Sequence, residues 1–248
     1  MPDQPLRNKT AIVTGAAKGM GRAIAQRLAA DGAFVVVNYA GSVEEANVTV
    51  AGITSAGGRA IAAQADVSHS QSVVDLFSIA ERAGGGVDIL VNNAGRATRK
   101  PLAEFTDAEF DALTATNLRG TFLTLREAAK RMRENGRVVN ISASFQGAPI
   151  PGYGPYAATK MAVEQLTAVA AKELGSRGIT VNAVRPGPTR TDLFMHGKDD
   201  ALVAKFAAMA ALNRIGEPSD IANVVSFLCG PEGGWVTGQA IGANGGYW

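Results

Sequence analysis

The amino-acid sequence predicts an α/β protein built on one doubly wound parallel sheet of about seven strands, with helices on both faces. Short β-rich runs alternate with longer helical patterns along the 248 residues, which is the order that produces βαβ units. The strand-like runs are nearly all apolar, as expected when helices cover both faces of a sheet. The 29 glycines supply many tight strand–helix junctions. No linker rich in Pro or Ser interrupts the chain, so residues 1–248 are expected to form one domain.

Strands are expected where short runs of apolar or β-branched residues stand between turn-forming residues. In chain order they cover residues 10–14, 34–38, 60–66, 89–92, 137–141, 179–184 and 239–243. The longer helical patterns cover a stretch from the first glycine turn to about residue 30, and then residues 44–55, 70–82, 107–134 with a break near Gly120, 156–176, 201–211 and 218–228. Ligands of such sheets bind beyond the carboxyl ends of the strands, and we expect the site there.

The composition argues against several classes of protein. The formal net charge of +2, with no basic block, argues against a nucleic-acid partner. No apolar run reaches the roughly 20 residues that cross a bilayer, and the polar residues 1–9 do not resemble a signal peptide. The single cysteine, Cys229, rules out an intrachain disulfide and is expected to be a small buried hydrophobe, which fits a reducing cytoplasm. No His, Cys and Asp cluster has metal-ligand spacing, so no metal site is expected.

A glycine-rich turn follows the first expected strand and opens a helix, the context that a dinucleotide site requires. It contains Gly15, Lys18, Gly19, Met20 and Gly21. Gly15 permits a sharp turn, Gly19 lets the backbone approach a pyrophosphate, and Gly21 allows close packing of helix on strand. The helix N-terminus supplies free N–H groups and the positive end of a dipole. The turn therefore predicts a Rossmann-type dinucleotide-binding domain.

The residues after the second expected strand bear on which dinucleotide is bound. NAD sites usually place an Asp or Glu about 20 residues after the glycines, where it binds the ribose hydroxyls. Here the end of the second expected strand and the residues just after it include Asn38, Tyr39 and Ser42. Residues 38–42 contain no carboxylate that would repel a 2′-phosphate. Lys18 offers a cation to that phosphate, and Ser42 or Asn38 can add hydrogen bonds. The pattern favours NADP (NADPH) over NAD; the alternative for Lys18 is a solvated surface lysine.

Tyr156 and Lys160 stand four residues apart in an expected helix and therefore share one of its faces. A nearby ammonium favours phenolate and lowers the pKa of a tyrosine, so the pair is a candidate acid/base device. The alternative is a tyrosine packed on a lysine stem at a helix surface. The dinucleotide turn favours the catalytic interpretation.

Five motifs stand together in the order and spacing of a known family. They are Thr14-Gly15-x-x-x-Gly19-x-Gly21, Asn92-Asn93-Ala94-Gly95, Asn117, Tyr156-x-x-x-Lys160 and Pro186-Gly187. The chain resembles, over essentially its whole length, the short-chain dehydrogenases/reductases. Within them it is most similar in pattern to the NADPH-dependent 3-oxoacyl-carrier-protein reductases and related ketoreductases.

The resemblance implies catalytic roles. Tyr156 would be the general acid that protonates the substrate oxygen as hydride arrives from the nicotinamide. Lys160 would bind the nicotinamide ribose and lower the pKa of Tyr156. Asn117 would hold a water that relays protons to Lys160.

The resemblance also implies cofactor contacts beyond the glycine turn. Asp66 and Val67 match the pair that contacts adenine. Asn93, Ala94 and Gly95 would line the adenosine-ribose side of the cleft. The loop that holds the nicotinamide amide is matched by Pro186, Gly187, Thr189 and Thr191. Together these contacts would hold nicotinamide and substrate carbonyl in reacting orientation.

The substrate-binding serine is the main departure from the family pattern. The family commonly places it thirteen residues before the tyrosine, where this chain has Ala143. A spacing of fourteen selects Ser142, whereas counting back from Gly147 favours Ser144. Both stand on the same side of an extended strand. We favour Ser142 as the substrate contact and expect at least one of the two serines to be structural.

Substrate specificity is expected in three segments, residues 146–155, 96–101 and a small lid around 193–211. Apolar and aromatic residues of the third segment suggest a cover over a hydrophobic or mixed substrate. They include Phe194, Met195, His196, Phe206 and Met209. The terminal Tyr247 and Trp248 either lie at a subunit contact or tuck onto their own fold, and family members often form dimers or tetramers, so a homo-oligomer is expected.

The preferred function is an NADPH-dependent oxidoreductase that reduces a ketone, either an acyl thioester or a small carbonyl, or runs in reverse as an alcohol dehydrogenase. One alternative is an NAD-linked sugar or steroid alcohol dehydrogenase, which the missing carboxylate disfavours. The other is a non-catalytic NADP-binding sensor. The departure at Ala143 motivates the sensor, and the intact tyrosine, lysine and asparagine argue against it.

Overall fold

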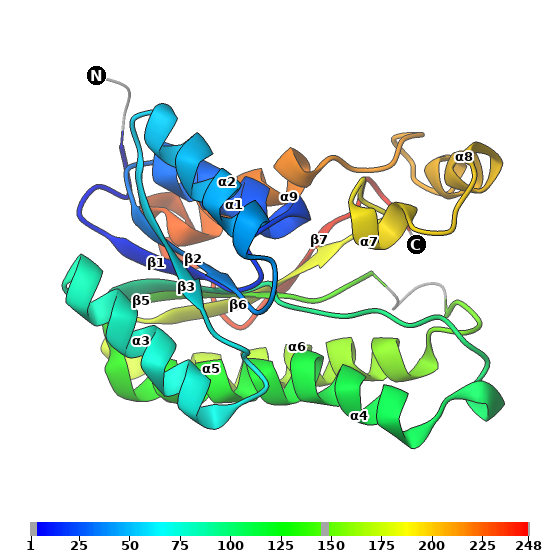
Figure 1. The fold of residues 1–248 in the computed structure, drawn as a ribbon, viewed down its shortest axis with the longest axis horizontal. Helices are drawn as coiled ribbons and strands as arrows, with labels where there is room; N and C mark the ends of the chain where they lie inside the picture. The colour runs from blue at the N-terminus through cyan, green and yellow to red at the C-terminus, as the bar shows by residue number, and fades with distance from the viewer. Residues whose placement is uncertain (1–3, 145–148, 248) are drawn as a thin grey trace.

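The computed structural model describes residues 4–144 and 149–247, which form a three-layer arrangement of helices around one sheet (Figure 1). The sheet has seven strands, all parallel, in the order β3-β2-β1-β4-β5-β6-β7. The strands are β1 Thr10–Val13, β2 Phe34–Tyr39, β3 Arg59–Gln64, β4 Val87–Asn92, β5 Met132–Ile141, β6 Thr180–Pro186 and β7 Ala240–Ala243. The predicted fold class, an α/β doubly wound sheet with helices on both faces, is confirmed.

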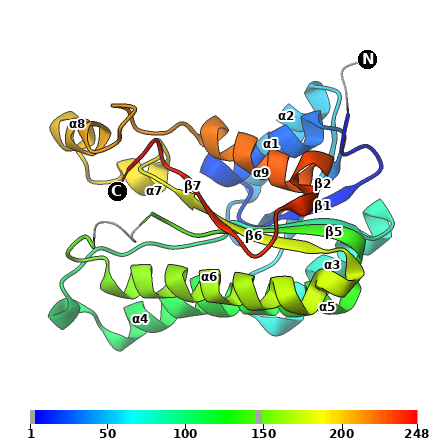
Figure 2. The same cartoon turned by 180° about the vertical axis from the view of Figure 1, so that it is seen from behind.

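The helices divide between the two faces of the sheet (Figures 1 and 2). One face carries α1 Gly19–Ala30, α2 Val43–Ser55 and α9 Pro218–Cys229. The other carries α3 Ser70–Gly84, α4 Asp107–Thr114, α5 Gly120–Arg131 and α6 Gly154–Leu174. The short helices α7 Asp192–Met195 and α8 Asp200–Ala208 lie beyond the carboxyl edge of the sheet, near the C-terminus. Single turns of 3-10 helix cover Leu102–Glu104, Gly175–Arg177 and Pro231–Trp235.

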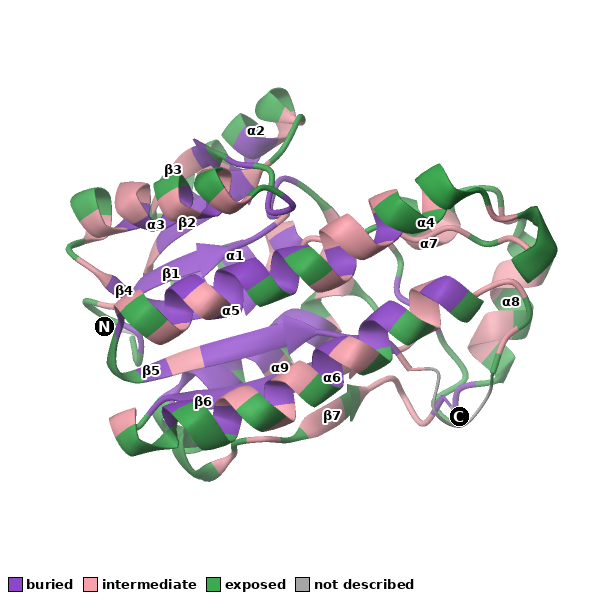
Figure 3. Cartoon of the chain, turned by 90° about the horizontal axis from the view of Figure 1, so that it is seen from below, coloured by how far each residue is buried: buried purple, intermediate pink, exposed green. Residues whose placement is uncertain are grey.

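Alternate residues of each central strand enter two separate cores, because strand side chains point to opposite faces. Val13 and Val35 pack with Leu28 of α1 and Leu228 of α9. Ile12 and Val36 enter the opposite core, which also contains the helix residues Leu76, Phe77, Leu123 and Leu174. Both faces of the central strands are therefore apolar, as the sequence predicts, and Figure 3 shows exposed residues along the outer sides of α5 and α6. Cys229 is buried in the first core with its pKa raised to about 12 by burial.

The expected long helix over residues 107–134 is wrong in two respects. A π-helical turn, Ala115–Arg119, separates α4 from α5, and the backbone continues through Gly120 without a break. The Thr121 hydroxyl donates to the Asn117 carbonyl oxygen in this widened turn. The helix also ends at Arg131, because Met132 already pairs with Val87 and starts β5 five residues earlier than expected. Tertiary strand pairing thus overrides the helical composition of residues 132–134.

The order of the strands places the site. The chain runs from β1 outward to β3, then returns to β4 on the other side of β1. The carboxyl ends of β1 and β4 therefore diverge into a crevice, the usual ligand site of such sheets. No helix in the described part of the chain is long and apolar enough to pass through a membrane.

Candidate active site

A cavity of about 640 Å³ lies at the carboxyl edge of the sheet. Its walls come from the glycine turn after β1, the end of β2, the segments after β4, β5 and β6, the start of α6, and the helices α7 and α8. Among the expected site residues, those lining it are Gly15, Lys18, Gly19, Met20, Gly21, Tyr39, Ser42, Asn93, Ala94, Gly95, Ser142, Ser144, Tyr156, Lys160, Pro186, Gly187, Thr189 and Thr191. Expected residues from six separate segments thus meet in one place.

The glycine turn has room for backbone only. Gly15 has φ +61°, and a Cβ there would meet the Ala94 Cα at 2.9 Å. A Cβ on Gly21 would lie 2.3 Å from the Gly15 carbonyl oxygen and 2.5 Å from Asn93 Nδ2. Gly19 also has a positive φ, +56°, and opens α1. The bare turn and the helix N-terminus behind it form a cradle that fits the pyrophosphate of a dinucleotide.

Hydrogen bonds from the end of β4 hold this turn in shape. Asn93 Nδ2 donates to the carbonyl oxygens of Thr14 (2.9 Å) and Gly15 (3.0 Å). The Thr14 hydroxyl oxygen accepts from the backbone N–H groups of Asn93 and Ala94, each at 3.0 Å. Thr14 is buried and is not among the residues expected at the site, although it opens the glycine motif. Asn93 and Thr14 therefore act on the cofactor cleft by fixing the backbone around Gly15.

Asn38 is not placed to bind a 2′-phosphate, which corrects one expectation. Its side chain is 1% exposed and does not line the cavity. Its Oδ1 accepts from Gly15 N at 3.2 Å, while its Nδ2 donates to the carbonyl oxygens of Ala63 and Ala65. All of these hydrogen bonds join β2 to the turn after β1 and to the end of β3. They satisfy the amide inside the protein, as a buried polar group requires, and leave it unavailable to a ligand.

Lys18 and Ser42 remain at the mouth of this part of the cavity. Ser42 stands at the N-terminus of α2 and its side chain makes no capping hydrogen bond. The Lys18 ammonium is half exposed and lies 3.9 Å from Asp192 Oδ2, which is itself 84% exposed. The cation of the glycine turn thus faces the first residue of α7 across the cleft.

Asp66 and Val67 do not line the cavity. Burial opposes the charge of Asp66, but hydrogen bonds from the hydroxyl and backbone N–H of Ser68, with His69 nearby, hold the pKa of this carboxyl below its usual value. Val67 is buried, and a Cβ on Gly120 would meet its Cγ2 at 2.8 Å. In this structure both residues serve the turn between β3 and α3.

The segment after β6 forms the opposite wall. Gly187 N donates to the Ala243 carbonyl oxygen, and a Cβ on Gly187 would meet the Asn244 Cα at 2.9 Å. The Thr189 hydroxyl donates to the Gly187 carbonyl oxygen at 2.9 Å. Thr191 caps α7 by accepting from Phe194 N. All three residues line the cavity together with Pro186, as expected of the nicotinamide loop.

Tyr156 and Lys160 lie side by side on α6 at the centre of the cavity wall. The Lys160 Nζ donates to the carbonyl oxygen of Ile141, the last residue of β5, at 2.7 Å. The same Nζ lies 5.8 Å from the centroid of the Tyr156 ring. A Cβ on Gly95 would lie 3.5 Å from both Lys160 Nζ and Asn117 Oδ1, so these groups flank the end of the Asn93–Gly95 segment. The shared helix face predicted from the i, i+4 spacing is present.

The electrostatics of this pair differ from the expectation. Burial, reinforced by the Tyr153 phenol, raises the pKa of Tyr156 above its ordinary value, where a lowered pKa was expected from the neighbouring ammonium. Burial also lowers the pKa of Lys160 from 10.5 to about 8. Desolvation outweighs attraction because the ammonium is bonded to a carbonyl and not to the phenol. Tyr156 is therefore a neutral proton donor at physiological pH.

Asn117 lies in the π-helical turn and is 1% exposed. Its Oδ1 accepts from Arg96 N at 2.8 Å, and its Nδ2 donates to the Arg96 carbonyl oxygen at 2.9 Å and to the Thr159 hydroxyl at 3.2 Å. The side chain ties the segment after β4 to α6, next to Lys160. A π turn beside functional residues is a recurring arrangement, since it displaces backbone groups from the regular helical ladder.

The two candidate serines have different surroundings. Ser142 is 2% exposed, and its hydroxyl donates to Glu164 Oε1 at 2.7 Å. Glu164 is also paired with Arg185 through two hydrogen bonds of 2.8 and 2.6 Å. The Ser144 hydroxyl is partly exposed, donates to the Arg185 carbonyl oxygen at 3.1 Å and accepts from Asn244 Nδ2 at 3.1 Å. Ser142 is bound to a carboxylate, the stronger partner, so Ser144 is the freer donor.

The end of the cavity beyond Tyr156 is largely aromatic. Tyr153 lies 6.1 Å from Tyr156 between ring centroids, and Phe194 packs edge-on against Phe206 at 5.3 Å. Ile150, His196 and Tyr247 complete this end. Met195 and Met209 do not line it. Tyr247 is 3% exposed and packs onto its own fold. Of the two expectations for this residue, packing on its own fold is the one that the structure shows.

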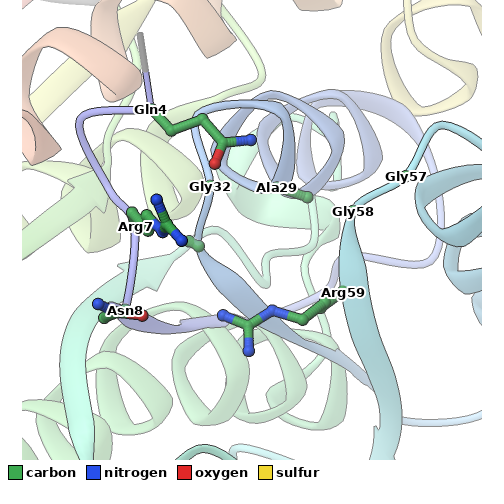
Figure 4. A pocket seen from close by; sticks show the side chains of 9 residues that line it. Gln4, Arg7, Asn8, Ala29, Gly32, Gly57, Gly58 and Arg59 are labelled. Atoms are coloured by element: carbon green, nitrogen blue, oxygen red, sulfur yellow. The ribbon is translucent and has the colours of Figure 1, made fainter. Parts of the chain in front are cut away.

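Residues 145–148, part of the expected substrate segment 146–155, and Trp248 lie outside the described residues. A second hollow, of about 260 Å³, lies at the opposite edge of the sheet, where β1, β2 and β3 begin (Figure 4). It is lined by polar groups, among them Arg7 and Arg59, and contains none of the expected site residues.

Comparison with known proteins identifies the family. A family model described as Enoyl-(Acyl carrier protein) reductase matches residues 15–248. An Arabidopsis thaliana protein named NADPH-dependent aldehyde reductase-like protein, chloroplastic, is 42% identical, with 99% of this chain and 96% of that protein covered. The chain belongs to the short-chain dehydrogenase/reductase family. It is an oxidoreductase of the dehydrogenase/reductase class that acts on carbonyl and alcohol groups.

Two further similar proteins support the same family assignment. A 3-oxoacyl-(acyl-carrier-protein) reductase of Staphylococcus epidermidis is 40% identical, covering 96% of this chain and 98% of the relative. The crystal structure of a short chain dehydrogenase from Burkholderia cenocepacia in complex with NADP is 39% identical, covers 98% of this chain and 99% of that one, and superposes with a TM-score of 0.93. The fold is therefore that of the family over nearly the whole chain.

Proposed function

We propose that this short-chain dehydrogenase/reductase uses NADPH to reduce a ketone, such as an acyl thioester or a small carbonyl compound, to an alcohol. The observation that carries the proposal is the Tyr156–Lys160 pair, with a neutral, half-buried phenol at the meeting point of the cofactor cleft and the aromatic end of the cavity. A protonated tyrosine is what a reductase needs as general acid. The name of the staphylococcal relative supports a ketone as the substrate.

The cofactor assignment rests on the chemistry of the cleft. The bare glycine turn fits a pyrophosphate, and residues 38–42 contain no carboxylate to repel a 2′-phosphate. Lys18 would pair with that phosphate and Ser42 would hydrogen-bond to it. The NADP-bound Burkholderia structure and the NADPH-dependent plant relative support NADP over NAD.

The proposed mechanism divides the work among a few side chains. The chemistry that bound NADPH supplies is hydride transfer to the carbonyl carbon. Tyr156 donates its phenolic proton to the carbonyl oxygen, and Lys160, positively charged below pH 8, stabilises the phenolate left behind. Ser144 donates a hydrogen bond to the same oxygen. Asn117 holds the segment after β4 against α6 and keeps Lys160 in place, and a water bound there would return the proton.

Two structural roles belong to the same proposal. Residues 1–248 would act as one dinucleotide-binding domain in which residues 193–211, with α7 and α8, form a lid over the substrate. The contact of Phe194 with Phe206 at the cavity supports the lid. Exposed apolar side chains on α4, α5 and α6, including Phe110, Phe122 and Val169, support a homodimer or homotetramer.

The test is NADPH and NADH oxidation, followed at 340 nm, against acetoacetyl thioesters, diketones and cyclic ketones. Tyr156→Phe should lower kcat by roughly 10²- to 10⁴-fold and leave NADPH affinity unchanged, because it removes only the proton donor. Tyr153→Phe, a neighbouring ring in the same cavity, is the matched control and should retain most of kcat. Turnover that survives in Tyr156→Phe contradicts the proposal. NADPH binding without turnover of any compound would favour a non-catalytic sensor.

A further inference from the structure

Asn244 lies behind the cavity wall, in the segment that follows the edge strand β7. It does not line the cavity, whereas Ser144, the proposed donor to the substrate oxygen, does. Asn244 Nδ2 donates a hydrogen bond to the Ser144 hydroxyl oxygen at 3.1 Å, and the two residues are 100 apart in the sequence. The contact therefore ties the end of the chain to the side chain that would bind the substrate oxygen.

The backbone around Asn244 fixes which end of its amide faces Ser144. Gly246 N can only donate, and it donates to Asn244 Oδ1 at 3.1 Å. The Tyr247 carbonyl oxygen can only accept, and it accepts from Asn244 Nδ2 at 3.1 Å. Exchanging the two ends of the amide would lose both hydrogen bonds. The atom beside the Ser144 hydroxyl is therefore a donor, and this assignment does not depend on the serine.

The donor of Asn244 decides what the Ser144 hydroxyl can do. A serine hydroxyl has one hydrogen to donate and two lone pairs to accept with. Asn244 occupies a lone pair, so the hydrogen of Ser144 points elsewhere, and here it goes to the Arg185 carbonyl oxygen at 3.1 Å. A hydroxyl that accepts one hydrogen bond is polarised and becomes a stronger donor in the next. Asn244 thus holds the Ser144 oxygen and strengthens its hydrogen as a donor.

The segment that carries Asn244 is itself fixed against the loop expected to hold the nicotinamide. Gly187 N donates to the Ala243 carbonyl oxygen at 3.2 Å, and a Cβ on Gly187 would meet the Asn244 Cα at 2.9 Å. Ser144 N donates to the carbonyl oxygen of Pro186 at 3.1 Å. Asn244 therefore stands where the cofactor loop and the serine segment meet, with little freedom to move relative to either.

We propose that Asn244 is a positioning residue for carbonyl reduction, which keeps the Ser144 hydroxyl hydrogen available to the substrate oxygen. The inference rests on the proposed function, because it needs Ser144 to bind that oxygen. Ser142 shows the opposite case at the same strand end. Its hydroxyl donates to the Glu164 carboxylate at 2.7 Å, so its hydrogen is committed inside the protein. An acceptor at position 244 would commit the hydrogen of Ser144 in the same way.

Asn244→Asp tests this directly, because it keeps the size of the side chain and replaces the donor beside Ser144 with an acceptor. The Ser144 hydroxyl would then donate to a carboxylate, which is the stronger partner. We expect kcat to fall toward the loss of about 10²-fold expected for Ser144→Ala. The KM for the ketone and the affinity for NADPH should stay within a few-fold of wild type, because the hydrogen bond matters most as charge develops on the substrate oxygen.

Asn244→Ala separates positioning from a merely structural role. It removes the donor without adding an acceptor, so the Ser144 hydrogen stays available and kcat should fall only several-fold. A structural role predicts the reverse order of the two variants. Alanine loses the hydrogen bonds to Gly246 N and to the Tyr247 carbonyl oxygen, whereas aspartate keeps an acceptor for Gly246 N.

A double-mutant cycle assigns the effect to Ser144. Ser144→Ala combined with Asn244→Asp should have about the kcat of Ser144→Ala alone, because the hydroxyl that Asn244 orients is already gone. Ser142→Ala combined with Asn244→Asp is the control cycle. Its two factors should multiply, because the Ser142 hydroxyl donates to Glu164 and to the Lys160 carbonyl oxygen.

Asn182 offers a matched control for the amide. It is 0% exposed on β6, its Nδ2 donates to the Val236 carbonyl oxygen at 2.7 Å, and its Oδ1 accepts from Gln239 N at 3.1 Å. The two backbone contacts resemble those of Asn244, without a serine. Asn182→Asp should lower the unfolding free energy in urea and keep kcat, counted per NADPH-binding site, within a few-fold of wild type.

The inference and the proposed function fail in different ways. Wild-type kcat in Asn244→Asp, a larger loss in Asn244→Ala than in Asn244→Asp, or multiplying factors in the Ser144 cycle would each overturn the positioning role and leave the reductase intact. Wild-type kcat in Ser144→Ala would do the same, since there would be no donor to position. Absence of turnover by the wild type with every ketone would count against the reductase, and the positioning role would fall with it.

Discussion

The Lys160 ammonium donates a hydrogen bond to the Ile141 carbonyl oxygen at 2.7 Å, so the last residue of β5 holds the charge of α6 beside the Tyr156 ring. The contact joins residues 19 apart in the sequence, and Lys160 as a whole is 5% exposed. A charge buried this deeply costs stability, and active sites commonly accept such a cost.

The first prediction concerns the pH dependence of that cost. In the unfolded chain Lys160 regains a pKa near 10.5, whereas the folded value is about 8. Between these values the unfolded state binds more protons, so stability rises with pH; below pH 8 the whole cost, about 3 kcal/mol, is present. Lys160→Met removes it. The difference in unfolding free energy between variant and wild type should therefore fall by about 1 kcal/mol from pH 7 to pH 9.

Urea unfolding at the two pH values measures this difference. Lys172→Met, an exposed lysine on the same helix, is the control and should show no such pH dependence. If the difference in unfolding free energy between Lys160→Met and wild type does not change with pH, the Lys160 ammonium is not desolvated. The same variant should lose at least roughly 10²-fold in kcat, because the phenolate loses its cation.

The second prediction separates the two serines. Ser144→Ala should lower kcat by about 10²-fold, the usual cost of removing one donor to a developing oxyanion. Ser142→Ala should leave kcat within a few-fold and lower the unfolding free energy by about 1 kcal/mol, because a hydrogen bond to Glu164 is lost. Steady-state kinetics and urea unfolding of both variants give the answer. The reverse pattern would restore Ser142 as the substrate contact.

The third prediction concerns Gly21. Alanine there places a Cβ 2.3 Å from the Gly15 carbonyl oxygen and 2.5 Å from Asn93 Nδ2, and these two atoms are hydrogen-bonded to each other. We expect a loss of about 1 to 3 kcal/mol in unfolding free energy and at least tenfold weaker NADPH binding, because the turn must open. Gly175→Ala is the control, since its Cβ would meet nothing within 4 Å. Tight NADPH binding by Gly21→Ala, measured by fluorescence titration, would be inconsistent with the cradle.

The fourth prediction tests the cofactor choice. Lys18→Gln should raise the KM for NADPH by roughly tenfold and leave the KM for NADH unchanged, because only NADPH carries the 2′-phosphate. Asp192→Asn removes the carboxylate 3.9 Å from Lys18 and should keep or slightly improve NADPH affinity. An equal change in the KM for NADPH and for NADH in Lys18→Gln would show that Lys18 does not bind the 2′-phosphate.

Much of the fold follows from local patterns. Apolar runs of strand length, glycines at turns and the spacing of Tyr156 and Lys160 are properties of neighbouring residues, and they predicted seven parallel strands and a shared helix face. The end of α5 was missed because the pairing of Met132 with Val87 is a contact between distant residues. The role of Asn38 was missed for the same reason, since its partners lie in the turn after β1, on β3 and just after β3.

Local sequence patterns were enough to predict the family, the position of the dinucleotide cleft and the residue types at its centre. Which of those groups remain available for chemistry depends on the folded arrangement of the side chains. The Ser142 hydroxyl donates to Glu164, and burial keeps Tyr156 protonated. The physical reason is that hydrogen-bond partners, desolvation and charge pairing depend on side chains brought together from distant segments, and no local pattern records them.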